Sequence, residues 1–255
     1  MPHISFSEFK NWATCPFYHK LKNIDKVDSF EGNEYTAFGT AIHTVCENLL
    51  TNNINDGKKL FKESFDSNLE ELSTELNQSL VKSMYTQGET IIPLIMPEVK
   101  KYFNNFEVIS VEEKLYEPID DFEDYNFKGF IDAVIKTDDG KYHIIDWKTC
   151  SWGWNTKKKS DPLVTYQLTF YKKYFAKKFN IDPDNIETYF ALLKRTAKND
   201  NVEMVRITSG PKKTQNALKY LHKALHNITK QNYVKNRISC TSGYGCEFYK
   251  TKYCK

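Results

Sequence analysis

The amino-acid sequence predicts an α/β protein in which a small sheet is flanked by helices, and three observations support this prediction. Apolar residues recur at helical spacing before residue 103 and again over 162–178 and 213–231. From Glu107 to Thr149 they alternate with polar residues, which is typical of half-buried strands. The 255 residues are 40% hydrophobic and 15% aromatic, so the chain can bury a substantial core and is not disordered.

The first predicted helices lie near the N-terminus. Ser5 and Glu8 have the spacing of a capping box and open a short helix that runs toward Cys15-Pro16. A second helix is expected over Phe38–Leu50 because its apolar residues follow the helical period.

A third helical stretch runs from Lys58 to Tyr102. It is expected to break between Gly88 and Pro97, because glycine and proline weaken a helix interior. We interpret residues of about 51–105 as a helical insertion in a single domain that spans residues 1–255.

The predicted sheet follows this insertion. Its first three strands cover about residues 108–116, 126–136 and 141–149. A further strand over 186–195 is expected between the helices of 162–178 and 213–231, and a cysteine-bearing tail ends the chain.

The turn Asp138–Gly140 lies between two of these strands and suits a three-residue hairpin loop with its glycine in the left-handed conformation. Such a loop pairs Thr137 with Lys141. Counting back along both strands then sets Asp132 directly opposite Asp146.

Side chains alternate along a strand, so Lys148 shares the face of Asp132 and Asp146, whereas Ile145 and Trp147 point to the other side. Two opposed carboxylates repel each other, and a divalent cation removes that repulsion. Oxygen ligands of this kind suit Mg2+ or Mn2+, which promote phosphodiester hydrolysis. The alternative is that these are solvated residues at strand ends.

Two helices carry polar residues at four-residue spacing. Gly39, His43 and Glu47 lie one turn apart on one helix, and Gln167 and Tyr171 lie one turn apart on another. Taken alone, His43 would more often be a core histidine, and Gln167 and Tyr171 could be ordinary polar residues of an interface. The order of these elements along the chain is what favours a shared site.

The segments GTAIHTVCE, GFIDAVI, IIDWKT and YQLTFY, in that order, resemble the motifs of the RecB-like nucleases in the PD-(D/E)XK superfamily. The resemblance extends from Cys15 to the C-terminus, apart from the helical stretch after Leu50. It implies a restriction-endonuclease-like core, with a small mixed central sheet flanked by helices, and a metal-dependent deoxyribonuclease. From its position alone, the helical stretch from Lys58 to Tyr102 is expected to form an arch or wall that limits access to strands with a free end.

The resemblance also implies roles for individual residues. Trp147 would add its backbone carbonyl to the metal ligands, Lys148 would position the attacking water, and Glu47 and Glu113 are left open as additions. Glu112 beside Glu113 makes the facing side ambiguous. The implied catalytic set is His43, Asp132, Asp146, Lys148, Gln167 and Tyr171, of which His43, Asp132 and Asp146 would bind the metal.

Four cysteines resemble the iron-sulfur staple of a RecB-like subset that includes AddB-type helicase-nucleases and CRISPR-associated nucleases. A [4Fe-4S] cluster would tie the tail of residues 238–255 to the N-terminal segment. The spacing within the tail departs from the usual pattern, so structural Zn2+ or unligated thiols stay open. The four are Cys15, Cys240, Cys246 and Cys254, whereas Cys46 and Cys150 are expected to be small buried residues.

The net charge of +3 conceals an asymmetry, because residues 1–140 carry −12 and residues 141–255 carry +15. The basic part is the expected polyanion contact, although a solvated lysine-rich surface is the alternative. Tryptophans beside these lysines could either stack on unpaired bases or pack in the core, and the two alternatives are equally supported. The expected DNA-contacting residues are Trp152, Trp154, Lys157, Lys158, Lys159, Lys172 and Lys173.

No secretory signal or apolar membrane span is visible, so we expect a protein of the cytoplasm of a bacterial or phage-infected cell, with reduced thiols. The expected function is a sequence-independent exonuclease acting on single-stranded or end-containing DNA in recombination, repair or phage-type replication. DNA is the expected partner, and a helicase or recombination protein is a further one. The alternatives are a non-cutting DNA-binding or partner-docking subunit and a structure-specific endonuclease.

Overall fold

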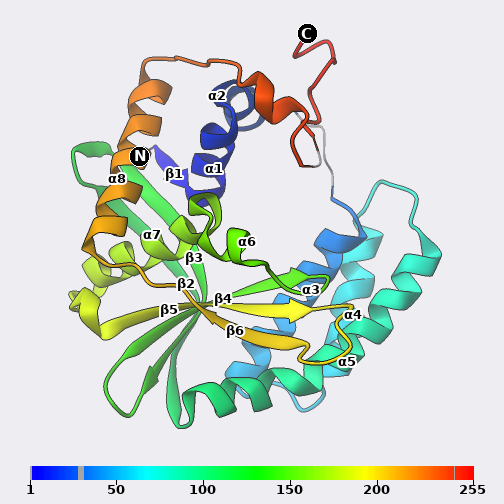
Figure 1. Ribbon diagram of the computed structural model, residues 1–255. Coiled ribbons are helices and arrows are strands. Elements are labelled where there is room, and N and C mark those ends of the chain that lie inside the picture. Colours follow the sequence, from blue (N-terminus) through cyan, green and yellow to red (C-terminus); the bar gives the residue numbers. More distant parts are fainter. Residues whose placement is uncertain (1, 28–31, 244) are drawn as a thin grey trace. The chain divides into compact units, whose positions relative to one another are not determined.

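Six strands form one mixed sheet in the order β1-β3-β4-β5-β6, with β2 paired to β3 (Figure 1). The computed structural model describes residues 2–27, 32–243 and 245–255. The chain divides into two compact units. Unit 1 holds residues 1–30, 115–129 and 210–255, and unit 2 holds residues 31–114 and 130–209. The single domain expected from the sequence stays a prediction.

Unit 2 contains most of the sheet and most of the helices. Two long strands, β2 and β3, belong to it only in part. Its elements are α3 (Glu34–Leu50), α4 (Gly57–Glu70), α5 (Gln78–Phe103), β2 (Phe106–Ile119), β3 (Phe122–Thr137), β4 (Tyr142–Cys150), α6 (Thr156–Ser160), α7 (Pro162–Phe179), the 3-10 turn η2 (Pro183–Asn185), β5 (Ile186–Lys194) and β6 (Val202–Arg206).

The strand directions confirm the predicted mixed sheet. β3 and β4 are antiparallel, β4 and β5 are parallel, and β5 and β6 are antiparallel. The predicted strand over 186–195 is β5, which starts and ends within one residue of the prediction. β6 has no counterpart in the sequence-based prediction, since it is only five residues long and follows a polar turn.

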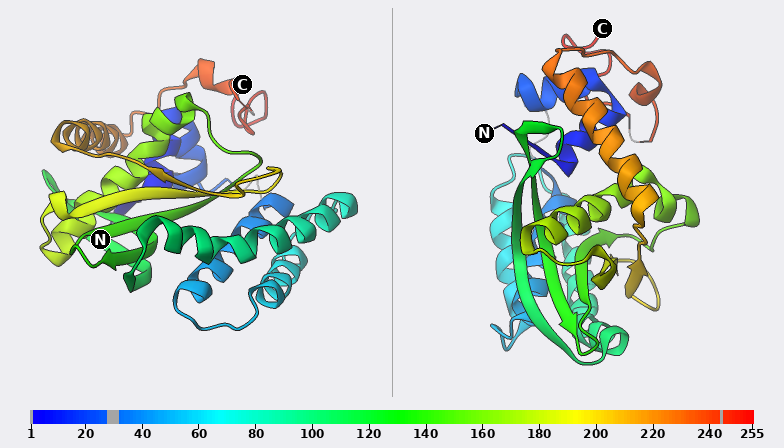
Figure 2. Two further views of the ribbon diagram at one scale, coloured as in Figure 1. Left: turned by 60° about the horizontal axis from the view of Figure 1, so that its bottom comes forward. Right: turned by 90° about the vertical axis from the view of Figure 1, so that its left-hand side faces the viewer.

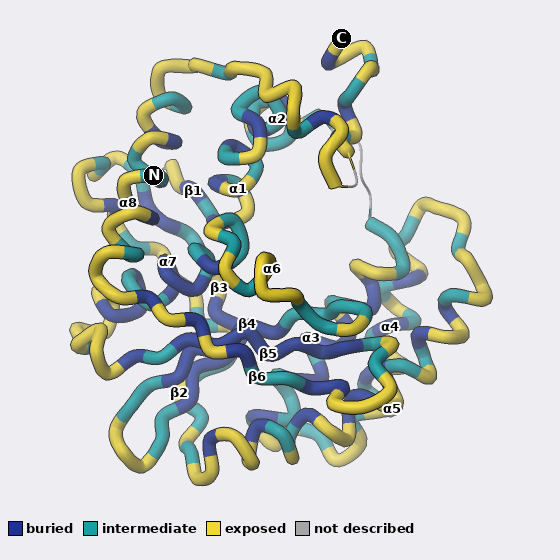
Figure 3. Tube along the Cα trace, viewed as in Figure 1, coloured by how far each residue is buried: buried dark blue, intermediate teal, exposed yellow. Residues whose placement is uncertain are grey.

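The sheet of unit 2 has helices on both faces. Apolar residues of β3, β4 and β5 face α3, α4 and α5, including Ala133, Trp147 and Ala191. The opposite face of β4 and β5 packs against α7, where the rings of Tyr142 and Phe175 lie 6.1 Å apart. Figure 2 shows α5 running beside the strands. Both faces of β4 and β5 are therefore buried, as their dark colour in Figure 3 indicates.

The helical insertion differs from the prediction in one respect. α5 continues without interruption through Gly88, Pro93 and Pro97, so the break expected between Gly88 and Pro97 is wrong. The chain leaves the helix earlier, between α4 and α5. Both prolines lie on the exposed side, where water can satisfy the carbonyls that lose a partner. A Cβ at Gly88 would lie 2.2 Å from Phe61 Cε1, so this glycine lets α4 and α5 approach closely.

Unit 1 combines both ends of the chain with residues 115–129, which hold the end of β2 and the start of β3. β1 pairs in parallel with β3 from His3–Asn126 to Ser5–Lys128. The predicted N-terminal helix is α1, and the Ser5 side chain caps it by accepting from the N–H of Glu8. The elements are β1 (His3–Ser5), α1 (Phe6–Thr14), α2 (Pro16–His19), the π-helical η1 (Lys20–Ile24), α8 (Pro211–Thr229) and the 3-10 turn η3 (Arg237–Cys240).

Within the described part of the chain, no helix has the length and apolar character needed to cross a membrane.

Candidate active site

The hairpin of β3 and β4 has the predicted register. The Thr137 N–H donates to the Lys141 carbonyl at 3.0 Å, and Gly140 has a φ of 83°, as the three-residue loop requires. The pairing runs as far as Ala133 and Ile145. Asp132 and Asp146 are the next residue on each strand, just beyond this paired part.

The two strands separate at this point in a way that positions a carboxylate. In an uninterrupted ladder the Trp147 N–H would donate to the carbonyl of Ile131. It donates instead to Asp132 Oδ2 at 2.7 Å. The backbone of β4 therefore holds the side chain of Asp132, a buried residue that is 8% exposed.

Asp146 and Lys148 form the centre of the candidate site. Lys148 Nζ lies 2.6 Å from Asp146 Oδ2, and Asp146 is only 1% exposed. Burial alone would lower the pKa of Lys148, but the carboxylates of Asp146 and Asp132 outweigh it and raise the pKa. Lys148 thus stays charged, which suits a residue that orients water or stabilises an anion.

Asp132 lies in an unfavourable environment for a carboxylate. Burial raises its pKa well above the ordinary value, and the charge of Asp146 raises it further, against the opposing effects of Lys148 and the Trp147 N–H. Asp146 Oδ2 is buried and accepts no hydrogen bond of good geometry, although it is paired with Lys148. A cation between the two carboxylates would relieve both conditions.

His43 approaches this pair from α3. Its Nδ1 lies 3.5 Å from Asp132 Oδ2, and the backbone carbonyl of Trp147 is close enough to its ring to raise its pKa slightly. Burial lowers the pKa of His43, so the imidazole is neutral and able to act as a metal ligand at pH 7. The three side chains and the one backbone carbonyl that were expected to bind a metal therefore lie close to one another.

Gln167 and Tyr171 join the same network from α7. Gln167 Nε2 donates to Asp146 Oδ1 at 2.8 Å and to Tyr171 Oη at 3.1 Å. Tyr171 is buried, and burial, followed by the charge of Asp146, raises the pKa of its hydroxyl. The pair fixes the orientation of the Asp146 carboxylate.

The structure also separates the two adjacent acids of β2. Glu113 is directed away from the candidate site and pairs with Lys178, whose Nζ lies 2.6 Å from Glu113 Oε1. Glu112, with a φ of 49°, lies beside Glu47 of α3. Burial and Glu112 raise the pKa of Glu47 to about 7. Glu112 also raises the pKa of Asp132, so it belongs to the surroundings of the site.

Sequence reasoning left this choice open because side-chain alternation assumes regular strand geometry. A positive φ is rare for glutamate and reverses the direction of the side chain. A Glu-Glu pair in a strand gives no sign of such an irregularity.

The donor set fits a hard divalent cation. Carboxylate oxygens, a neutral imidazole and a backbone carbonyl are ligands that Mg2+ and Mn2+ accept. Among the described residues, no set of three His, Cys, Asp and Glu side chains is spaced to enclose an ion. Lys148 and Gln167 engage the Asp146 carboxylate, so they would have to yield part of it to a metal.

The four cysteines singled out in the sequence all lie in unit 1. Cys15, Cys240 and Cys254 are buried, and Cys246 is half-buried. Burial raises the pKa of Cys246, and the three other cysteines raise it further, so the four sulfurs lie within electrostatic reach of one another. A cavity of about 900 Å³ is lined by Cys15, Cys240 and Cys246.

The two remaining cysteines lie in unit 2. Cys46 is fully buried and Cys150 is half-buried. Burial raises the pKa of both thiols, as expected for cysteines that pack rather than react.

The residues expected to contact DNA have different environments. Trp152 is 78% exposed, whereas the Trp154 ring packs 5.0 Å from Phe190 and lies under Lys158. Lys157 and Lys158 are exposed. Lys159 is paired with Glu203 at 2.6 Å, Lys172 is half-buried near Asp184 and Glu187, and Lys173 is half-buried on α7.

Comparison with known proteins agrees with this geometry. The sequence pattern of the PD-(D/E)XK nuclease superfamily matches residues 3–254. The chain therefore belongs to the PD-(D/E)XK nuclease superfamily, and this membership supports hydrolytic nuclease activity. No curated protein matches the sequence.

Two solved structures are similar to the chain. One is a protein from Eubacterium rectale described as a "putative exonuclease", with a TM-score of 0.61, 15% sequence identity, and coverage of 94% of this chain and 86% of that one. The other is SSO0001, with a TM-score of 0.44, 16% identity, and coverage of 96% and 83%. At these identities the first likeness concerns the fold alone.

Proposed function

We propose that the protein is a divalent-metal-dependent DNA exonuclease that cuts without sequence preference. The observation that carries this proposal is the convergence of His43, Asp132, Asp146 and Lys148 at the point where β3 and β4 separate. A protein that only bound DNA would have no use for two buried carboxylates beside a lysine.

Each residue has a defined task in this proposal. His43, Asp132, Asp146 and the Trp147 carbonyl would hold Mg2+ or Mn2+. The bound metal supplies Lewis acidity and lowers the pKa of a water molecule. Lys148 positions that water and stabilises charge on the phosphate, and Gln167 keeps the Asp146 carboxylate in place.

Contact with the DNA strand would come from the loop after β4. Trp152 is exposed directly beyond the Lys148 strand, and Lys157 and Lys158 follow it. Lysines bind phosphates whatever the sequence, and an exposed tryptophan can stack on an unpaired base. These properties support action on single strands or on DNA ends, in recombination, repair or phage-type replication.

We further propose that Cys15, Cys240, Cys246 and Cys254 hold a metal group in unit 1. The cavity lined by Cys15, Cys240 and Cys246 and the burial of Cys15, Cys240 and Cys254 support this proposal. A [4Fe-4S] cluster is the preferred occupant, and structural Zn2+ is the alternative. The absorption spectrum of protein purified without oxygen, together with its iron and zinc contents, distinguishes the two.

The nuclease proposal is tested with end-labelled linear and circular single-stranded and duplex DNA, in Mg2+, Mn2+ or EDTA. We expect metal-dependent release of short products from linear DNA and none in EDTA. Circular DNA should persist, because it has no end.

Three other outcomes would change the assignment. A wild-type protein that binds DNA but is inert in both metals would indicate a binding subunit. Discrete fragments from circular duplex would indicate an endonuclease. Equal rates on circular and linear single strands would remove the role of the α4 and α5 insertion in selecting free ends.

A further inference from the structure

Arg195 lies three residues beyond Leu192, the residue of β5 paired with Lys148, and has no assigned role. It follows β5, and its N–H donates to the Cys150 carbonyl at 2.8 Å. Thr196 donates in the same way to Ser151. Because β4 and β5 are parallel and Lys148 is paired with Leu192, Arg195 lies at the end of the sheet toward which the Lys148 strand runs.

The Arg195 side chain is held by neutral partners. Its guanidinium lies 4.8 Å from the centre of the Tyr35 ring and 5.7 Å from that of Phe38. Nη1 donates to Gln87 Oε1 at 3.2 Å, and burial lowers the pKa of the group. A guanidinium stays charged even so, and it has five N–H donors in a fixed plane.

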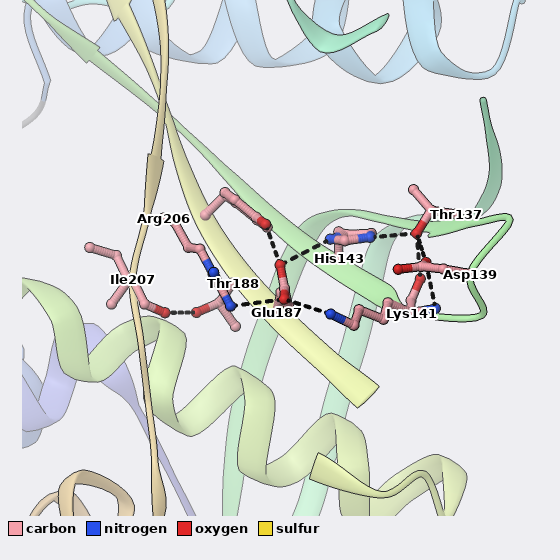
Figure 4. Close-up of polar contacts among 9 residues, drawn as sticks. Thr137, Asp139, Lys141, His143, Glu187, Thr188, Arg206 and Ile207 are labelled. Atoms are coloured by element: carbon pink, nitrogen blue, oxygen red, sulfur yellow. Dashed lines mark hydrogen bonds and ion pairs between the residues drawn. The ribbon is translucent and has the colours of Figure 1, made fainter. Parts of the chain in front are cut away.

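This arginine has no acidic partner among the described residues, which sets it apart. Arg206, on the neighbouring strand β6, is bonded to Glu187 Oε1 at 2.8 Å (Figure 4). A half-buried cation without a counter-ion costs folding free energy, unless the cation binds an anionic ligand when the protein functions. The chain has only three arginines among its 36 basic residues, so an arginine here is not part of a general basic surface.

The geometry of α3 connects Arg195 to the site. Tyr35, Gly39 and His43 are four residues apart and share one face of the helix. Eight residues of helix span about 12 Å, which corresponds to a few nucleotides of one strand. Between them, a Cβ on Gly39 would meet only Thr149 Oγ1, at 3.8 Å. Tyr35 is exposed, and Gly39 and His43 are half-buried, so this face of α3 is open in part from His43 to Tyr35.

We propose that Arg195 binds a phosphate of the DNA strand whose cleaved linkage lies at His43, Asp132 and Asp146. This inference rests on the proposed nuclease function and adds a positioning residue to it. The strand runs along the open face of α3, and the half-exposed ring of Tyr35 lies beside the base next to the bound phosphate. The aromatic rings and Gln87 keep the guanidinium plane ready for a bidentate phosphate contact.

The test measures binding of a 5′-fluorescein-labelled oligothymidylate in EDTA at several salt concentrations. Arg195→Ala is expected to weaken binding about tenfold and to reduce the slope of log affinity against log salt by about 0.7, the value for one phosphate contact on a single strand. Arg195→Lys keeps the charge but loses the fork, so it should retain the slope and lose part of the affinity. Arg206→Ala is the matched control and should behave like the wild type.

A second readout separates positioning from chemistry. Arg195→Ala should raise KM for oligonucleotides while leaving the hydrolysis of bis(p-nitrophenyl) phosphate unchanged, since this small diester cannot reach Arg195. Unchanged affinity and an unchanged salt slope in Arg195→Ala would overturn the proposal, as would an equal slope loss in Arg206→Ala. The binding measurement needs no cleavage, so an inert wild type would contradict the nuclease function without deciding this point.

Discussion

The two units of the chain hold their candidate functional groups in different ways. In unit 2 the acidic, basic and amide groups of the site sit on strands and helices and are bonded to one another. In unit 1 the four cysteines sit in irregular segments or next to short turns, and their sulfurs have only weak partners, such as the Asn236 N–H at 3.3 Å from Cys15 Sγ. Unit 2 would keep its site without a metal, whereas the proposed metal group of unit 1 would tie together segments that are otherwise held by few side-chain contacts.

The largest expected effect comes from the centre of the unit 2 site. Lys148→Ala should lower kcat by about 10²–10³-fold, because a charged group next to the reacting phosphate is lost. Lys178→Ala is a matched control and should leave kcat unchanged. Both lysine side chains are exposed to a similar extent, and each ammonium lies 2.6 Å from a carboxylate oxygen. The check is the cleavage rate on linear DNA in Mg2+. Equal rates for the Lys148 variant and the wild type would remove this lysine from the mechanism.

The converse effect is expected in unit 1. Cys240→Ala should lower the melting temperature by about 6–10 °C, corresponding to about 2–3 kcal/mol, and should reduce bound iron or zinc. The cleavage rate of the folded fraction should change little. Cys150→Ala is the control, because this thiol lies in unit 2 and is not in the cysteine group. An unchanged melting temperature together with unchanged metal content would refute the metal staple.

A smaller effect is expected at the exposed margin of the unit 2 site. Trp152→Ala should weaken single-strand binding about 5- to 30-fold, which is the usual size of one base-stacking contact. Trp152→Phe should restore most of it, because a ring is kept. Titration of tryptophan fluorescence with oligonucleotide measures both. If Trp152→Ala binds as tightly as the wild type, the exposed ring does not stack on DNA.

The smallest effect concerns a second polar network of unit 2, around Glu187 (Figure 4). Burial would raise the pKa of Glu187, but hydrogen bonds from Tyr189 and Lys141 and the charge of Arg206 lower it overall. A lowered pKa in the folded state means that ionised Glu187 stabilises the folded protein. This stabilisation is complete above the unfolded pKa, about 4.3, and it is lost as the pH falls through the folded pKa. The charged and titratable groups that face Glu187 are Lys141, His143, Lys172, Tyr189 and Arg206.

Glu187→Gln should therefore destabilise the protein by about 1–2 kcal/mol at pH 7 and by progressively less below pH 4. Urea unfolding at several pH values measures the difference. DNA cleavage should be unaffected, since Glu187 pairs with His143 near the start of β4 and away from Lys148. A difference that stays constant down to pH 3.5 would contradict the role of its ionised form.

The parts of unit 2 that follow regular geometry could be predicted from the sequence. The loop of Asp138–Gly140 determines the register of β3 and β4, and alternation then places Asp132, Asp146 and Lys148. His43 and Gln167 lie at the same site, as the resemblance to the RecB-like nucleases implied. The register prediction depends only on local periods, which explains why it agrees with the structure.

Other features depend on contacts that local periods do not contain. Glu112 reaches Glu47 only because of its positive φ. Gly88 lies inside a continuous helix, where Phe61 packs against it, and the sequence does not reveal this contact. Arg195 depends on rings of α3 and an amide of α5 that lie far from it in the chain. Whether the four cysteines bind a metal depends on the distances between segments that lie far apart in the chain, so metal binding by them stays a prediction.

The hydrogen bond from the Trp147 N–H to Asp132 has a consequence for the timing of catalysis. Because the backbone of β4 orients this carboxylate as the sheet forms, its rotational freedom is lost during folding and not in each catalytic cycle. An ion would then enter a site in which Asp132 is already oriented, and the reorganisation needed on binding would fall on Lys148 and Gln167, the two side chains that engage the Asp146 carboxylate.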